Sequence, residues 1–239
     1  MVELAFGIAG YAACGPLPDA SLDVFWPSRD DAVHGAPPRP PMPVLLRRRI
    51  TPIGQAVLRA AWSLPGLERA RFVFASRHGE FSRTLTMLEA MADDDDPAPA
   101  DFSLSVHNAL PGLLSISTRD RAGHTALAAG VDSFGFGLME AGVCLLEKPD
   151  EPVMLAYYDE ALPAGYPDTV PSGADATLAL ALMLVPSRQA ARHIVMAAIP
   201  AANPAPDESA AVVFLRFLRT EAAEASVNGE RMNWRWRHG

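Results

Sequence analysis

The sequence predicts an α/β fold in which one layered sheet lies between helices. Short apolar runs alternate along the 239 residues with segments that have helical spacing, and this alternation is typical of a sheet with helices on its faces. The run 176–184 alternates Leu with Ala or Met and is apolar on both sides, as expected for a strand that is covered on each face. We therefore expect residues 1–239 to form one domain of three layers.

The N-terminal part predicts a strand, a loop and a helix. Val2–Ala9 is rich enough in aliphatic residues for a buried first strand. Five prolines within 34–43 predict an irregular surface loop. A helix is expected from Pro52, with Thr51 as its N-cap, and its helical spacing of apolar residues continues until Pro65.

The next part of the chain predicts a strand followed by two helices. Arg71–Ser76 has the composition of a second strand, and 81–92 has apolar residues on one helical face. The acidic run Asp93–Asp96 would end that helix in an exposed loop. A third helix is expected at 103–116, with an early interruption at Pro111.

The remaining elements alternate in the same way. His124 to Gly130 is a short apolar run that ends at a glycine, and an amphipathic helix pattern that includes Phe134 follows directly. Glycines stand in that helix at positions where close packing would be needed. Further strands are expected at 153–158, 176–184 and 194–199, and a closing helix is expected at 208–225.

Leu127 occupies a position that would suit a reactive nucleophile. A strand, a sharp turn at Gly130 and a helix N-terminus would place the last strand residues beside unpaired backbone N–H groups and the positive end of the helix dipole. This environment lowers the pKa of a thiol, but a leucine side chain has nothing to ionise. The pattern predicts the architecture of a covalent catalyst without its chemistry, so we expect a function in binding and assembly.

Charge and cysteine content exclude several classes of function. The net charge of −8 argues against nonspecific binding to nucleic acid or to anionic membranes, because both need a cationic surface. Cys14 and Cys144 cannot define a disulfide framework and show no metal-ligand spacing, so we expect reduced thiols, no metal and no cofactor in a cytoplasmic protein. No window approaches the length of a membrane span. The basic clusters are Arg47, Arg48 and Arg49, and Arg231, Arg235 and Arg237.

Two short motifs resemble the N-terminal half of β-ketoacyl synthases of the thiolase superfamily. Those enzymes carry an Asn-x-x-x-Gly helix and a Thr-Ala-Cys-x-Ser-Gly turn that holds the nucleophile. The matching residues are Asn108 and Gly112 for the first motif, and Thr125, Ala126 and Gly130 for the second, with Leu127 at the cysteine and Ala129 at the serine. Segments 73–80, 101–109 and 157–163 are similar to the short ketosynthase-like proteins called chain length factors in aryl polyene pigment clusters.

The resemblance implies a fold and a division of labour. The fold would be a three-layer thiolase-like half, with a mixed five-stranded sheet between helices. Leu127 removes the nucleophile that accepts the acyl group, and the chain would also lack the half of a ketosynthase that supplies the paired histidines. We therefore expect no catalytic residue in this chain, and a heterodimer with an active ketosynthase subunit that performs the chemistry.

The resemblance also indicates which residues would meet the partner and line the acyl tunnel. The expected interface and tunnel residues are Asn108, Gly112, Leu113, Ile116, Leu127 and Phe134. An apolar wall there would limit the length of the growing chain by volume. Without the partner this face would be an exposed apolar patch, so we expect the isolated chain to self-associate. An acyl carrier protein is a further candidate partner, with the Arg-rich C-terminal segment as the surface in question.

Two other functions stay open at the level of sequence. Ser133 or Cys144, with a histidine such as His124, would serve an acyltransferase or hydrolase, although the residues around Ser133 do not have the Gly-x-Ser-x-Gly spacing of a serine elbow. The third function is a homodimeric acyl-binding module.

Overall fold

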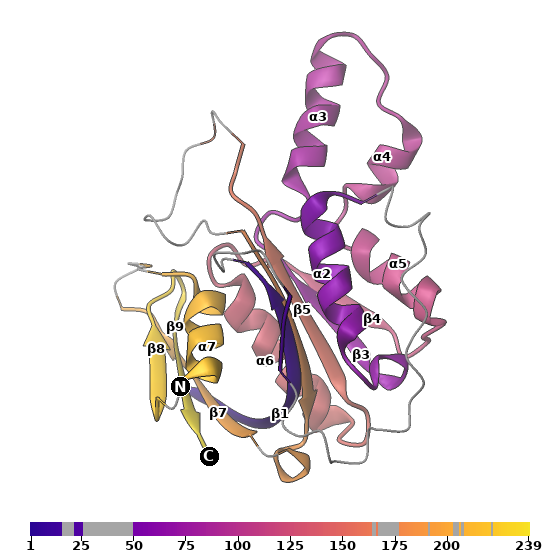
Figure 1. Cartoon of the computed structure of the whole chain (residues 1–239). Coiled ribbons are helices and arrows are strands. Elements are labelled where there is room, and N and C mark those ends of the chain that lie inside the picture. Colours follow the sequence, from indigo (N-terminus) through magenta and orange to yellow (C-terminus); the bar gives the residue numbers. More distant parts are fainter. Residues whose placement is uncertain are drawn as a thin grey trace.

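The computed structural model describes residues 1–15, 22–25 (backbone only), 50–163, 166, 177–190, 192–202, 206, 208–220 and 222–239. The predicted proline-rich loop at 34–43 and the basic cluster Arg47–Arg49 lie outside these residues. The elements are arranged as a twisted sheet with helices packed against it, and two of the helices project from one end (Figure 1).

Every strand of the described chain joins one mixed sheet. The strands are β1 (Val2–Cys14), β2 (Leu22–Phe25), β3 (Arg71–Ala75), β4 (His124–Leu127), β5 (Val153–Asp159), β6 (Leu178–Val185), β7 (Arg192–Pro200), β8 (Glu224–Val227) and β9 (Met232–His238). Eight of them follow the order β4-β3-β5-β6-β1-β7-β9-β8, and β2 pairs with β1 beside this path. Strands β4, β3 and β5 are parallel to one another, and the other pairs are antiparallel.

The described helices lie between these strands along the chain. They are α2 (Pro52–Ser63), α3 (Phe81–Ala92), α4 (Pro99–Leu104), α5 (Ala109–Thr118), α6 (Ser133–Glu147) and α7 (Ala210–Arg219), with 3-10 turns at Leu67–Arg69 and Ser187–Gln189. Thr51 caps α2 as predicted, because its Oγ1 accepts a hydrogen bond from the Gly54 N–H at 3.3 Å.

The expected number of strands was too small, because the sheet has nine strands and not five. The difference begins at β1, which has 13 residues and continues beyond the predicted end at Ala9. Residues 7–14 of this long strand pair with β6, whereas residues 2–8 pair with β7. Strand β1 thus joins two successive parts of the sheet. One part continues through β6, and the other continues through β7, β9 and β8.

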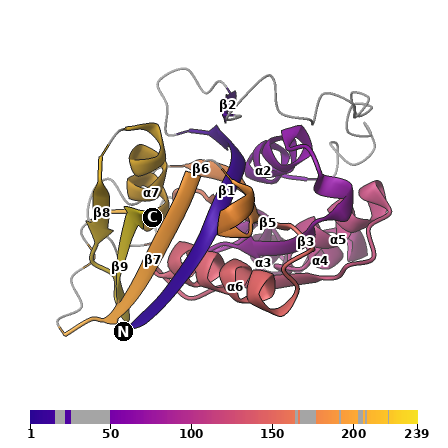
Figure 2. The same cartoon turned by 90° about the horizontal axis from the view of Figure 1, so that it is seen from below.

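The predicted three layers are confirmed, because helices pack on both faces of the central strands. Helices α2 and α6 lie on opposite sides of β5, β6 and β1 (Figure 2). The side chains of β6 are divided between two apolar clusters as the alternating sequence requires. Leu178, Leu180, Leu182 and Leu184 face the cluster of α6 and α7, whereas Ala179, Ala181 and Met183 face the cluster of α2.

The helix predicted at 103–116 is in fact two helices. Helix α4 ends at Leu104, and α5 begins at Ala109. Pro111 is the third residue of α5, where the backbone N–H has no partner within the helix. The proline therefore lies in the first turn of a helix and does not interrupt one.

The closing helix predicted at 208–225 is wrong in its second half. Helix α7 ends at Arg219, and residues 224–227 and 232–238 form β8 and β9. In β9, Trp234 and Trp236 are buried while the arginines between and after them are exposed. This alternation has the period of a strand, so the arginine-rich segment is an ordered strand that pairs with β7 on one side and β8 on the other.

Helices α3 and α4 form an arm that projects from the body (Figure 1). No residue of either helix is buried, although the predicted helical spacing in α3 is present. Arg83 of α3 pairs with Asp101 of α4 at 2.7 Å and joins the two helices. The segment Asp93–Asp96 between them is exposed, as predicted.

Two absences concern the described part of the chain. None of its helices combines the length and the apolar composition that crossing a membrane would demand. Within the same residues, no group of three or more His, Cys, Asp or Glu side chains is arranged to hold a metal ion.

Candidate functional site

Leu127 ends β4 at the edge of the sheet, as the last residue before the predicted turn. Its neighbour across the ladder is Ala75 of β3, and Ala75 in turn lies opposite Tyr157 of β5. All three side chains face the apolar cluster beneath α6 and α7, and Leu127 packs against that cluster. The Leu127 carbonyl accepts a hydrogen bond from the Ser76 N–H at 3.2 Å. The leucine is therefore a packed, unreactive side chain at the position where the motif places the nucleophile.

A five-residue turn connects Leu127 to α6, and Gly130 adopts a positive φ of 61° within it. Helix α6 begins at Ser133, two residues later than the sequence pattern predicts. The Ser133 hydroxyl donates to the Gly130 carbonyl at 2.7 Å and accepts from the Ala129 N–H at 2.9 Å. Ser133 is fully buried, so its hydroxyl closes the turn.

Asp132 ties this turn to the C-terminal strand. Its side chain is fully buried, and its carboxylate accepts hydrogen bonds from the Trp234 Nε1–H at 3.1 Å and the Arg231 N–H at 2.7 Å. A buried carboxylate is stable only when donors satisfy it. The start of α6 is therefore held against β9, which the sequence places about a hundred residues later.

A polar group that the sequence analysis missed lies at the ends of β3 and β5. The Tyr157 hydroxyl donates to Asp159 Oδ2 at 3.2 Å. Burial raises the pKa of the Asp159 carboxyl to about 7, and the positive charge of Arg77 and the hydrogen bond from Tyr157 offset only part of this effect. Burial, together with the negative charge of Glu80, raises the pKa of the Tyr158 hydroxyl well above its usual range.

The same group includes a buried carboxylate at the start of α2. Glu80 Oε1 accepts from the Thr51 N–H at 2.9 Å and from the Thr51 hydroxyl at 2.5 Å. Polar residues that follow two neighbouring parallel strands meet at one edge of a sheet, and this was the signal that could have identified the group. Its geometry joins α2, α3 and β5 and offers no paired nucleophile and base.

The structure brings some of the predicted interface residues together and separates others. Asn108, Gly112 and Ile116 follow one another at four-residue spacing along the outer side of α5, with Ile116 76% exposed. Nothing lies within 4 Å of a Cβ placed on Gly112. Leu113 packs inward against the cluster of α2, whereas Phe134 lies in the core among Tyr157, Phe214 and Trp236. Helix α5 contacts β4 from the face of the sheet that α2 covers, whereas the Leu127 side chain faces the cluster of α6 and α7 on the other face.

Ser133, Cys144 and His124, the candidate residues of an acyltransferase or hydrolase, are not arranged as an activated nucleophile with its base. The hydroxyl of Ser133 is fully occupied, as described above. Cys144 is buried near the end of α6, and burial raises the pKa of its thiol, as do the charges of Glu140 and Glu147 against the opposing effect of Arg71. A thiol is least nucleophilic under these conditions. His124 is exposed at the first residue of β4.

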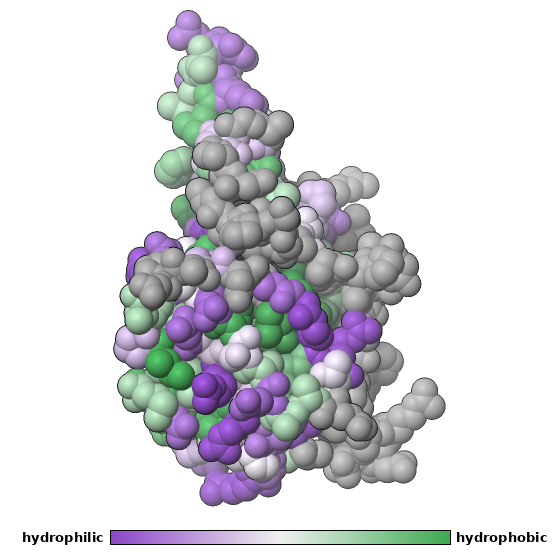
Figure 3. Space-filling model, turned by 90° about the vertical axis from the view of Figure 1, so that its left-hand side faces the viewer, coloured by the Kyte–Doolittle hydropathy of each residue, from purple (hydrophilic) through white to green (hydrophobic). Residues whose placement is uncertain are grey.

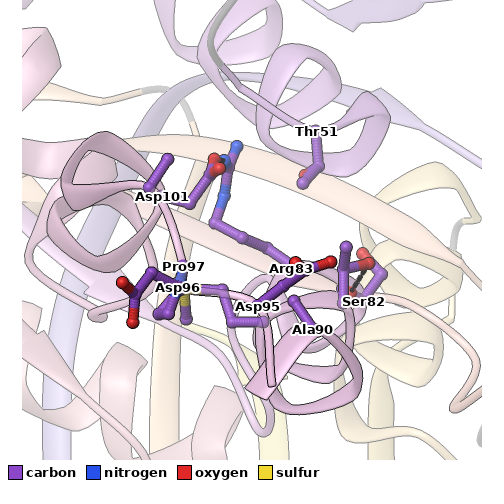
Figure 4. Close-up of a pocket in the computed structure, with 11 residues that line it drawn as sticks. Thr51, Ser82, Arg83, Ala90, Asp95, Asp96, Pro97 and Asp101 are labelled. Atoms are coloured by element: carbon purple, nitrogen blue, oxygen red, sulfur yellow. Dashed lines mark hydrogen bonds and ion pairs between the residues drawn. The ribbon is translucent and has the colours of Figure 1, made fainter. Parts of the chain in front are cut away.

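An open cavity of about 530 Å³ lies between the arm and the start of α2. Arg83 extends across it towards Asp101, and Thr51 and Ser82 lie on the opposite side (Figure 4). Because the guanidinium of Arg83 is already paired with Asp101 at 2.7 Å, the cavity has no uncompensated positive charge at its centre. It is a hollow at the base of the arm.

Comparison with solved structures supports the assignment of the fold. A structure of the ketosynthase ApeO in complex with its chain length factor ApeC, from Xenorhabdus doucetiae, contains a chain that superposes with a TM-score of 0.76 at 22% identity, over 98% of this chain and 99% of that one. A β-ketoacyl synthase from Burkholderia phymatum superposes with a TM-score of 0.50 at 13% identity, over 81% of this chain and 63% of its own length. Among curated protein sequences, none matches this chain.

The fold and the Leu127 turn define a ketosynthase-like α/β protein in which the side chain at the turn cannot act as a nucleophile. The model of the family "Beta-ketoacyl synthase, N-terminal domain" matches residues 24–237. The chain therefore belongs to the β-ketoacyl synthase N-terminal domain family.

Proposed function

We propose that this chain is a non-catalytic ketosynthase-like subunit, a chain length factor, that pairs with an active β-ketoacyl synthase. The observation that carries the proposal is the position of Leu127, which ends the strand before the turn and packs, partly buried, against the core. Covalent acyl transfer needs a group that can ionise and attack, and leucine has none. The related complex named above supports this reading, since it consists of a ketosynthase and a chain length factor.

The surface that would meet the ketosynthase is built from β4 and α5. Strand β4 ends the path of the described sheet, so one of its edges has backbone groups that no described strand pairs. Helix α5 contacts β4, and Ile116 of this helix has most of its side chain exposed. An unpaired strand edge next to an apolar helix face is a common basis for association between subunits.

Chain length would be controlled by volume at this surface. Once the end of the growing acyl chain touches an apolar wall, a further unit would overlap with the wall. This steric overlap would cost about 1–3 kcal/mol of free energy. Because the earlier resemblance is to factors of aryl polyene clusters, we infer a polyene-type acyl chain that is elongated in the cytoplasm. An acyl carrier protein would deliver the units to the ketosynthase.

Formation of the complex tests this assignment. We expect co-expression with an active β-ketoacyl synthase of the same organism to give a stable 1:1 complex by size-exclusion chromatography with light scattering. We expect Ile116→Asp to weaken the complex by at least about tenfold, since it places a charge in a desolvated interface. The matched control is Val2→Asp, because Val2 is 49% exposed at the start of β1, which is separated from β4 in the sheet by β3, β5 and β6. A wild-type chain that forms no complex would refute the proposal.

Replacing Leu127 with cysteine should not create an acyl-accepting chain. The new thiol would take the partly buried place of the leucine and pack against the cluster of α6 and α7, which shields it from a reagent in solution. In a Cys14→Ser background, we expect iodoacetamide at neutral pH to label Leu127→Cys at least about tenfold more slowly than Ile116→Cys, whose side chain would be exposed. Equal labelling rates, or an acyl adduct on Leu127→Cys, would contradict this expectation.

A further inference from the structure

The arm, defined as residues 81–106, lacks the packing that would stabilise it alone. It comprises α3, α4 and the segment that follows α4, and no residue of either helix is buried. Helices of 12 and 6 residues are marginal in water without an apolar face that is covered. An ion pair between Arg83 and Asp101 links the two helices, and one such pair contributes little to stability.

The arm exposes apolar side chains along its length. Leu88 is 50% exposed, Met91 58%, Phe102 67% and Val106 51%. In Figure 3 the arm stands at the top, with apolar residues running along it and hydrophilic residues at its tip. Clustered exposure of large apolar side chains marks a surface that associates with another molecule.

The arm is also strongly acidic. Six acidic side chains and one arginine give it a net charge of −5, out of −8 for the whole chain. The arginine is Arg83, which is already paired with Asp101. Among the described residues, Asp93–Asp96 at the tip have no ion-pair partner, so no described cation compensates this negative charge.

These two properties together restrict what can cover the arm. We propose that the arm selects between partners, so that it accepts a cationic, apolar recess on the ketosynthase subunit and disfavours a second copy of this chain. This inference rests on the proposed function for the identity of the partner. A symmetric dimer brings the same patch of both copies together, so two arms in contact would place like charges opposite each other. Such repulsion is a usual means of rejecting a wrong partner.

The position of the arm is consistent with this role. Helix α4 packs against α5, and α5 packs against β4. The arm therefore continues the surface of Ile116 and the β4 edge, and a subunit seated on that edge would be within reach of the arm (Figure 1).

Neutralising the tip tests the electrostatic part of the proposal. We compare the quadruple variant Asp93→Asn, Asp94→Asn, Asp95→Asn and Asp96→Asn with the wild-type chain. We expect its Kd for the co-expressed ketosynthase to rise about tenfold at about 50 mM salt and to lose most of its dependence on salt. The matched control changes the net charge equally at exposed acids outside the arm. It combines Glu3→Gln, Asp150→Asn, Glu224→Gln and Glu230→Gln, and we expect less than about a twofold effect.

A second readout needs no ketosynthase. In sedimentation velocity of the isolated chain at low salt, we expect the quadruple Asn variant to self-associate at lower concentration than the control variant, because the repulsion between arms has been removed. If both variants bind and self-associate alike, the selective role of the arm is refuted while the proposed function stands. If the wild-type chain binds no ketosynthase, the proposed function fails. In that case, equal self-association of the quadruple Asn variant and the control variant would separately refute the role of the arm.

Discussion

Replacing Gly135 with alanine is expected to destabilise the chain by about 3 kcal/mol or more. A Cβ at this position would lie 2.1 Å from Cε2 of Trp234 and 2.4 Å from its Cδ2, which is far inside van der Waals contact. The indole cannot easily move away, since it is 1% exposed, its Nε1–H is bound to Asp132, and the ring of Phe136 lies against it with centroids 5.2 Å apart. The added methyl group must therefore displace either α6 or β9.

Chemical denaturation of the isolated chain measures this effect. The control is Gly112→Ala in α5, where the same added methyl group meets nothing within 4 Å. There we expect a small gain in stability, of roughly 0.5–1 kcal/mol, because alanine favours a helix more than glycine does. Equal stability of Gly135→Ala and Gly112→Ala would show that α6 and β9 are not packed as described.

Stability is expected to fall as the pH rises towards neutral, and Asp159 is the cause. Its pKa is raised from 3.8 to about 7 in the folded chain, so the folded state holds a proton that the unfolded state has released. The stability that protonated Asp159 contributes is fully present below the pKa of its carboxyl in the unfolded state. It is lost as the pH rises through the pKa of that carboxyl in the folded state. Between about pH 5 and about pH 8 the loss is on the order of 3 kcal/mol.

Asp159→Asn should remove most of this pH dependence. The amide oxygen can still accept the hydrogen bond from Tyr157, but the residue no longer ionises at neutral pH. We expect the variant to gain stability relative to the wild-type chain as the pH rises from about 5 to about 8, by up to roughly 3 kcal/mol. Asp150→Asn, at an exposed residue, is the control and should follow the wild-type curve. A parallel pH dependence of wild type and Asp159→Asn would exclude Asp159 as the group responsible.

The elements that were predicted correctly carry local signals. Thr51 and Pro52 begin α2 because a hydroxyl acceptor and a missing N–H both suit the first turn of a helix. The strand at 178–185 followed from its alternation of leucine with smaller residues, and each set faces its own apolar cluster. In both cases the information lies within about ten residues along the chain.

The elements that were missed depend on distant partners. Residues 208–225 contain enough alanine and apolar spacing for a single helix, but β8 and β9 form because they pair with each other and with β7. Phe134 was expected at an interface, yet the aromatic rings of Tyr157, Phe214 and Trp236 enclose it in the core. Tertiary pairing of this kind overrides local propensity.

The candidate site divides in the same way. That Leu127 cannot act as a nucleophile followed from the sequence, since no environment can ionise a hydrocarbon side chain, and the turn around Gly130 was signalled by its glycine. Only the tertiary structure decided that Asp132 binds β9, that Asp159 is buried beside Tyr157, and that an acidic apolar arm stands beside the β4 edge. These three features depend on burial and on contacts between segments far apart in the chain. The spacing of neighbouring residues encodes neither the burial nor the contacts.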